Sequence, residues 1–122
     1  MNRHVLLQAA AVALLFCGAA AAEPESVSGE VMKQCQPPAK PEVPNGRTAT
    51  EEEMLAASKA VKDYLSASES YISCLHKVET SWGEEETEEQ RAVIVIFHNR
   101  QVEEMHATGD LFNQAVRAYK GR

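Results

Sequence analysis

The stretch AVIVIFH, Ala92–His98, decides between two folds, because it places six apolar residues in a row directly before a histidine. A short β-branched run is typical of a buried strand, whereas a surface helix is apolar on one face only. Apolar residues continue beyond it at helical spacing for three more turns, and no partner strand follows. The stretch is therefore predicted to be helical. Its β-branched residues lower helix propensity, so tertiary packing must hold it.

Apolar residues recur at alternating steps of three and four in two segments, which is the pattern of a coiled-coil seam. Each seam contains one polar interruption, Ser68 in the first and His98 in the second. The first seam comprises Met54, Ala57, Val61, Tyr64, Ser68, Tyr71, Leu75 and Val78. The second comprises Val95, His98, Val102, Met105, Gly109, Phe112, Val116 and Tyr119.

The two seams match when the chain is folded back at Gly83. Ser68 then faces His98, and the small residues Ala57 and Gly109 also coincide. This agreement predicts an all-α fold, an antiparallel two-helix coiled hairpin, with helices over about 50–81 and 85–120. Thr50 and Glu53 form the capping box that begins the first helix.

The segment before the hairpin is predicted to be extended. Residues 35–49, here called the strap, contain four prolines and one glycine, a composition that excludes a helix. An extended strap can run back along the first helix until Cys35 reaches Cys74. These two cysteines are expected to form a disulfide, with two free thiols as the alternative. Closing this loop of about 39 residues would stabilise the fold by about 4 kcal/mol in the chain-entropy model.

The N-terminus has the pattern of a secretory signal peptide, with Arg3, an apolar run over residues 5–17, and small residues before Glu23. Ala20 and Ala22 fit the cleavage rule, which places the cut after Ala22. The apolar run is too short for a membrane span. Lipidation at Cys17 is the alternative, but the bulky Phe16 before it argues against a lipobox. Residues 1–22 are thus a signal peptide, 23–49 an extended segment with the strap, and 50–122 the hairpin, placing the protein in the periplasm or outside the cell.

The net negative charge of the chain argues against two classes of binding partner. Without Arg3, 11 basic residues stand against 18 acidic ones, a net charge of −7. Nucleic acids and anionic membrane surfaces attract clustered positive charge, so neither is an expected partner. No nucleophile elbow, glycine-rich phosphate loop or CxxC motif occurs in the chain. We therefore expect no enzyme, no catalytic residue and no cofactor.

Metal binding is the alternative function. Imidazole and thioether ligands suit copper or zinc, and the candidates are His76, His98, Met105 and His106. A metal site needs three or four converging ligands, and the predicted hairpin brings together at most two, so no metal residue is assigned. The acidic run Glu84–Glu89 lacks the alternating oxygen ligands of a calcium loop.

Residues 35–75 carry a resemblance. Cys35, the spaced prolines, Gly46, the run ATEEEM and the helix end at Tyr71–Cys74 resemble small uncharacterised exported proteins of proteobacteria. The resemblance implies a location in the bacterial envelope. It brings no activity, cofactor or site residue with it.

One flank of the predicted hairpin is apolar and uncovered. In that arrangement Ile96 and Ala92 meet Leu65 and Ile72, and Val93 extends the patch. An uncovered aliphatic cluster typically marks an interface. The sequence therefore predicts a non-enzymatic interaction or structural module that binds an envelope protein, or itself as a homodimer. Residues 23–34 folding back over the patch are the alternative.

Overall fold

The computed structural model describes residues 25–122, and all regular structure in that range is helical. The elements are α1 (Val27–Gln34), α2 (Glu51–Trp82), the 3₁₀ turn η1 (Gly83–Glu85) and α3 (Glu88–Lys120). The prediction of an all-α fold is confirmed. The predicted signal peptide and its cleavage site after Ala22 lie outside the described residues. None of the helices within residues 25–122 combines the length and apolarity that a membrane span requires.

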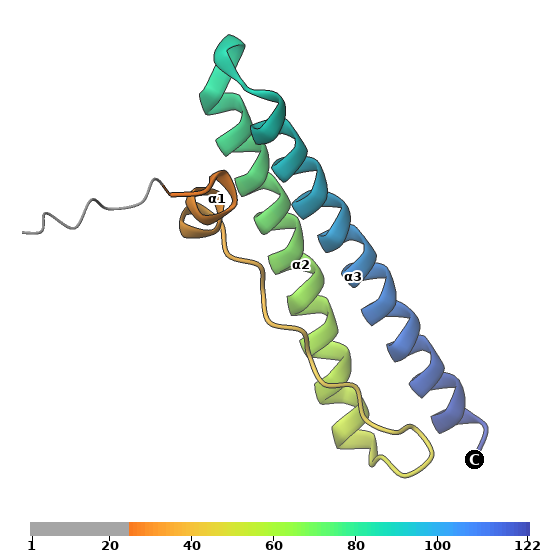
Figure 1. Ribbon diagram of the computed structural model, residues 1–122. Coiled ribbons are helices and arrows are strands. Elements are labelled where there is room, and N and C mark those ends of the chain that lie inside the picture. The colour runs from red at the N-terminus through yellow and green to blue at the C-terminus, as the bar shows by residue number, and fades with distance from the viewer. Residues whose placement is uncertain (1–24) are drawn as a thin grey trace, which may run out of the picture.

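The two long helices lie side by side, α2 running to the tip at η1 and α3 running back beside it (Figure 1). Local signals set their ends. The Thr50 hydroxyl accepts from the Glu53 amide while the Glu53 carboxylate accepts from the Thr50 amide, at 3.1 and 2.7 Å. Thr87 and Gln90 form the same capping box at the start of α3. Gly83 ends α2 with a φ of 59°, a left-handed conformation that glycine adopts without strain.

The seam of α2 is buried as predicted. All eight of its positions from Met54 to Val78 are buried, and Ser68 is completely enclosed. Tyr71 lies in this seam, and burial raises the pKa of its phenol, an effect that the positive charge of Arg100 opposes.

The seam of α3 differs from the prediction by one residue. Its buried positions are Ile94, Gln101, Thr108 and Ala115, an uninterrupted heptad repeat. The predicted seam residues Val95, His98, Val102, Met105 and Gly109 instead lie to one side, and Val95 is 48% exposed. The predicted contact of Ala57 with Gly109 is also wrong, because nothing lies within 4 Å of a Cβ built at Gly109.

The seam of α3 is offset by one residue because its buried residues pack against α1 and the strap as well as against α2. α1 was not predicted, since residues 23–34 were expected to be extended, yet its Val31 is fully buried against Leu75 and Ile94. Val93 and Phe97 pack against the same cluster. A hairpin of two helices alone would leave this apolar flank of α3 exposed to solvent. In the structure α1 covers the flank, and the buried face of α3 is rotated toward α1.

A buried amide, rather than His98, completes the polar layer. Gln101 Nε2 donates to Ser68 Oγ at 2.8 Å and lies 3.2 Å from the Tyr64 hydroxyl. Ser68 Oγ in turn donates to the Tyr64 carbonyl. The predicted contact of Ser68 with His98 is wrong, and His98 Nδ1 lies 3.3 Å from the side-chain oxygen of its neighbour Asn99. Leaving a buried amide without partners costs about 1–3 kcal/mol, so this layer fixes the helix register.

A double-mutant cycle tests the polar layer. Ser68→Ala and Gln101→Leu should couple by about 1 kcal/mol in the free energy of unfolding, because the two side chains share a hydrogen bond. The matched cycle of Ser68→Ala with His98→Leu should be additive. Denaturant unfolding gives both values, and additivity of the first cycle would contradict the observed register.

The strap contacts both long helices along one face (Figure 1). Lys40 Nζ donates to Glu104 of α3 at 2.7 Å, and this bond raises the pKa of the Lys40 ammonium group. Further along, a Cβ built on Gly46 would lie 1.9 Å from the Ala115 carbonyl oxygen and 2.9 Å from the Tyr119 nitrogen. The strap backbone comes so close to the α3 backbone here that only glycine, which has no side chain, fits at position 46.

The two glycines predict opposite effects on stability. Gly46→Ala should lower the free energy of unfolding by about 1–3 kcal/mol, because α3 backbone occupies the space of the new methyl group. Gly109→Ala, in the interior of α3 with open space around it within the chain, should raise that of the dilute monomer by about 0.5–1 kcal/mol. Thermal melts of both variants check the pair, and a neutral Gly46→Ala would show that the strap does not press on α3.

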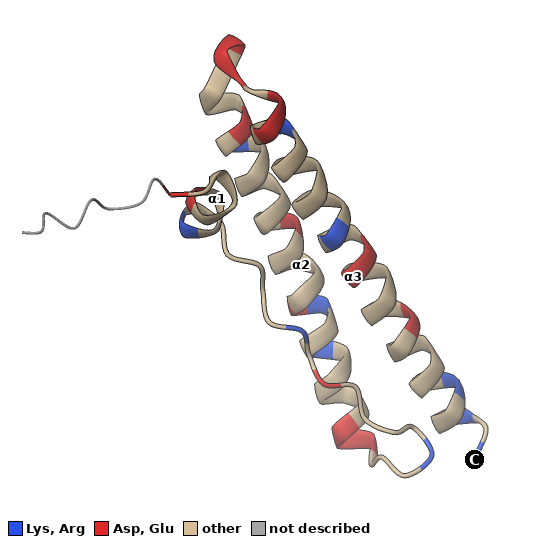
Figure 2. Ribbon diagram, viewed as in Figure 1, with Lys and Arg blue, Asp and Glu red and all other residues tan. Residues whose placement is uncertain are grey.

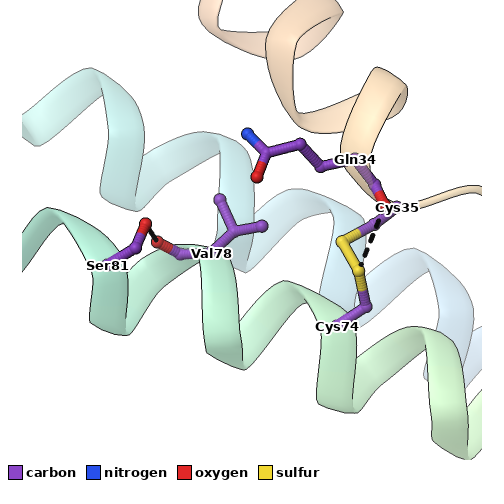
Figure 3. The surroundings of a disulfide bond; sticks show 5 residues. All are labelled: Gln34, Cys35, Cys74, Val78 and Ser81. Atoms are coloured by element: carbon purple, nitrogen blue, oxygen red, sulfur yellow. Dashed lines mark hydrogen bonds between the residues drawn. A yellow bond between two sulfur atoms is a disulfide. The ribbon is translucent and has the colours of Figure 1, made fainter.

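A disulfide attaches the other end of the strap to α2. Cys35 and Cys74 are bonded, with 5.8 Å between their Cα atoms, which confirms the predicted pairing (Figure 3). Cys74 Sγ also lies 3.4 Å from the Gln34 carbonyl oxygen. This sulfur carries no proton, so the approach is a van der Waals contact. Cys35 is nearly fully buried, so the bond places α1 against the core.

Reduction of this bond should destabilise the fold. Opening a loop of 39 residues removes about 4 kcal/mol in the chain-entropy model. Urea unfolding with and without a reductant measures the effect, and the Cys35→Ser/Cys74→Ser double variant, which should not respond to reductant, is the control. Equal unfolding midpoints for the oxidised and reduced wild-type protein would contradict the role given to the bond.

Candidate interaction site

The two faces of the α2–α3 pair differ in what covers them. On one face, α1 buries Val31 against Leu75 and Ile94 near the tip. Toward the other end, Ala49 at the end of the strap packs with Met54 and Ala115. Arg122 closes this end by donating to the Ala49 carbonyl at 2.7 Å. This face is therefore occupied along most of its length.

The opposite face holds an apolar groove between the two helices. The groove, here called the open groove, is lined by Leu65 and Ile72 of α2 and by Val95, His98, Val102 and Met105 of α3, and the core residues Leu75 and Ile94 also line its smaller hollow. It comprises two hollows of about 210 and 390 Å³ that share Ile72. No described segment outside α2 and α3 lines either hollow.

Only part of the predicted interface lies together on one surface. Leu65 and Ile72 lie in the open groove, but Ala92 and Ile96 line neither hollow, and Ile96 is 54% exposed. At 100° per residue, Ile96 points away from the buried position Ile94 and from α2. Val93 packs against the cluster around Val31 on the covered face. Ala92 and Ile96, which were predicted to meet Leu65 and Ile72, thus do not line these hollows with them, and Val93, predicted to extend their patch, lies on the covered face.

Val95, Val102 and Met105 take their place beside Leu65 and Ile72. The sequence does signal these residues, since they recur at heptad spacing, but the prediction assigned them to the interior of the hairpin. The same one-residue offset of the α3 seam accounts for both errors.

The rim of the open groove carries polar side chains. His76 Nδ1 lies 3.4 Å from a Glu79 carboxylate oxygen, and both residues line the smaller hollow with His98 and Asn99. His106 and Asp110 line the larger one. Within residues 25–122, no three His, Cys, Asp or Glu side chains converge closely enough to hold a metal ion. The groove thus has an apolar floor and a mixed polar edge.

Charge is distributed unevenly along the helices. The acidic tip comprises Glu84, Glu85, Glu86, Glu88 and Glu89, and the last turn of α3 is basic, with Arg117 and Lys120 (Figure 2). Arg91 is already bonded to Glu86 at 3.0 Å. The open groove therefore lies between an acidic and a basic end of α3.

Comparison with protein-family models, curated proteins and solved structures finds no match to this chain. The resemblance of residues 35–75 to small exported proteins stays a prediction.

Proposed function

We propose that this protein is an exported interaction module that acts in the periplasm or outside the cell without catalysis. In this proposal the antiparallel hairpin of α2 and α3 is a scaffold, and the disulfide-pinned strap seals one of its faces. The open groove on the other face binds a protein partner, either a second copy or another envelope protein.

The observation that carries this proposal is the contrast between the two faces. α1 and the strap contact one side of the helix pair, whereas on the other side no described segment besides α2 and α3 lines the open groove around Val95 and Val102. Val95 leaves nearly half of its surface in water. Apolar residues that line a groove at heptad spacing suit a helical partner, which inserts its side chains between them.

Binding of copper or zinc remains the second candidate. It is favoured by one observation, that His76, Glu79 and His98 line the same hollow. Because these side chains do not converge in the structure, a metal would have to draw them together. Calorimetric titration with either ion decides this candidate. Binding no tighter than about micromolar would remove it, and loss of tighter binding in His98→Ala would support it.

Site-specific photo-crosslinking tests the proposed interface. A photoreactive amino acid at Val95 should give a protein adduct in the cells that produce the protein. The same residue at Ile96 is a matched control, since the two neighbours are similarly exposed but only Val95 lines the groove. Adducts of equal yield and mass at both positions, or none at Val95, would contradict the proposal.

A further inference from the structure

We propose that the open groove binds a second copy of this chain, related by a two-fold axis perpendicular to the helices, so that each long helix lies antiparallel to its counterpart. The result is a four-helix bundle with the two covered faces outward. This inference rests on the proposed function, because it names the partner of the same groove.

The position of the groove suits a two-fold axis. Such an axis brings a surface patch against itself, so the overlap is greatest when the patch lies at the middle of the element. The midpoint of α2 falls close to Leu65, and that of α3 falls between Val102 and Met105. All three residues line the larger hollow. Two copies crossing there overlap over the full length of both helices.

The ends of α3 supply charge complementarity. Glu88 lies one heptad before Val95, and Lys120 lies one heptad after Asn113, so both continue the stripes that line the groove. With the axis at the middle of α3, Glu88 of one copy falls opposite Lys120 of the other. The symmetry makes this ion pair twice.

The ends of α2 add little net charge to this arrangement. With the axis at the level of Leu65, the acidic first turn, Glu51–Glu53, falls opposite Lys77–Glu79 of the other α2, which carry one positive and one negative charge. The antiparallel dimer is therefore favoured at one pair of helix ends and close to neutral at the other.

A parallel dimer through the same groove is disfavoured. It would place the two acidic tips together, with five glutamates from each copy over residues 84–89 (Figure 2). The nearby Arg91 is already engaged by Glu86 within its own chain. Like charges at this distance repel, so the tips orient the copies in opposite directions.

Gly109 provides space for the second copy. It lines the larger hollow, and nothing lies within 4 Å of the position of its absent Cβ. In the antiparallel arrangement this gap falls within a turn of His98 and Asn99 of the other copy. A side chain from one helix can thus enter a gap in the other, as in other helix pairs.

Sedimentation velocity on the mature chain, residues 23–122, at low salt tests the inference. The wild-type protein should form a dimer. Lys120→Glu and Glu88→Lys should each raise its Kd about tenfold, because each change acts on two symmetric contacts. The combined variant should return to within about threefold of wild type. Glu89→Lys makes the same charge change in the first turn of α3 but lies off the groove stripes, so it should stay within about twofold.

Electron–electron distance measurement tests the orientation without weakening the contact. Spin labels at Glu85→Cys should lie about 50 Å apart in the antiparallel dimer, the length of a helix of 33 residues. A separation below about 20 Å would indicate the parallel dimer and overturn the inference.

The outcomes separate this inference from the proposed function. A protein that stays monomeric at the highest concentration overturns the inference, as does a dimer in which Glu88→Lys and Lys120→Glu do not compensate. In either case an adduct from Val95 to a different protein still supports the groove as a binding site. Absence of any adduct from Val95 overturns the function itself.

Discussion

A covalent bond at one end and a backbone contact at the other hold the strap against a single face of the helix pair. Cys35 is bonded to Cys74 in the third of α2 nearest the tip, and Gly46 meets the Ala115 carbonyl near the opposite end of the helix pair. Between them, Lys40 bonds to Glu104. Because both ends are fixed, the strap covers one face of the pair along most of its length. The strap and α1, joined at Cys35, cover the same side of the pair: α1 buries Ile94, and Val95 and the open groove lie on the side that neither covers.

The sequence predicts α2 well because its buried positions coincide with its own heptad pattern, although α1 and the strap also contact it. Its apolar and small residues recur at heptad spacing, and its buried positions agree with that spacing. The ends of α2 were also predictable, since Thr50 and Glu53 form a capping box whose geometry depends only on neighbouring residues. Local rules succeed for α2 because its apolar stripe and its capping residues agree with its buried face.

α3 was misplaced by one residue because its partner is not α2 alone. Its true seam includes Gln101 and Thr108, which hydrophobicity alone would place in water. Gln101 is acceptable there because Tyr64 and Ser68 satisfy its amide, and Ile94 is buried because α1 covers it. α1 itself has a weak apolar pattern with one fully buried residue, Val31, so its sequence gave little sign of a helix. The sequence therefore predicts half of the site. It assigns Leu65 and Ile72 correctly to an exposed apolar surface, but it assigns Val95 and Val102 to the core between the helices, whereas both line the groove.

The account depends on α3 turning Ile94 inward and presenting Val95 and Val102 to a partner. Methyl NMR with a soluble paramagnetic probe measures this directly, because only methyl groups in contact with solvent are strongly broadened. In dilute protein, the methyl groups of Val95 should be strongly broadened and those of half-buried Val102 less so, while those of Ile94 and Val31 are protected. At high concentration, Val95 and Val102 should become protected as well. Broadening of Ile94 in place of Val95 would contradict the seam, and with it the groove on which the proposed function rests.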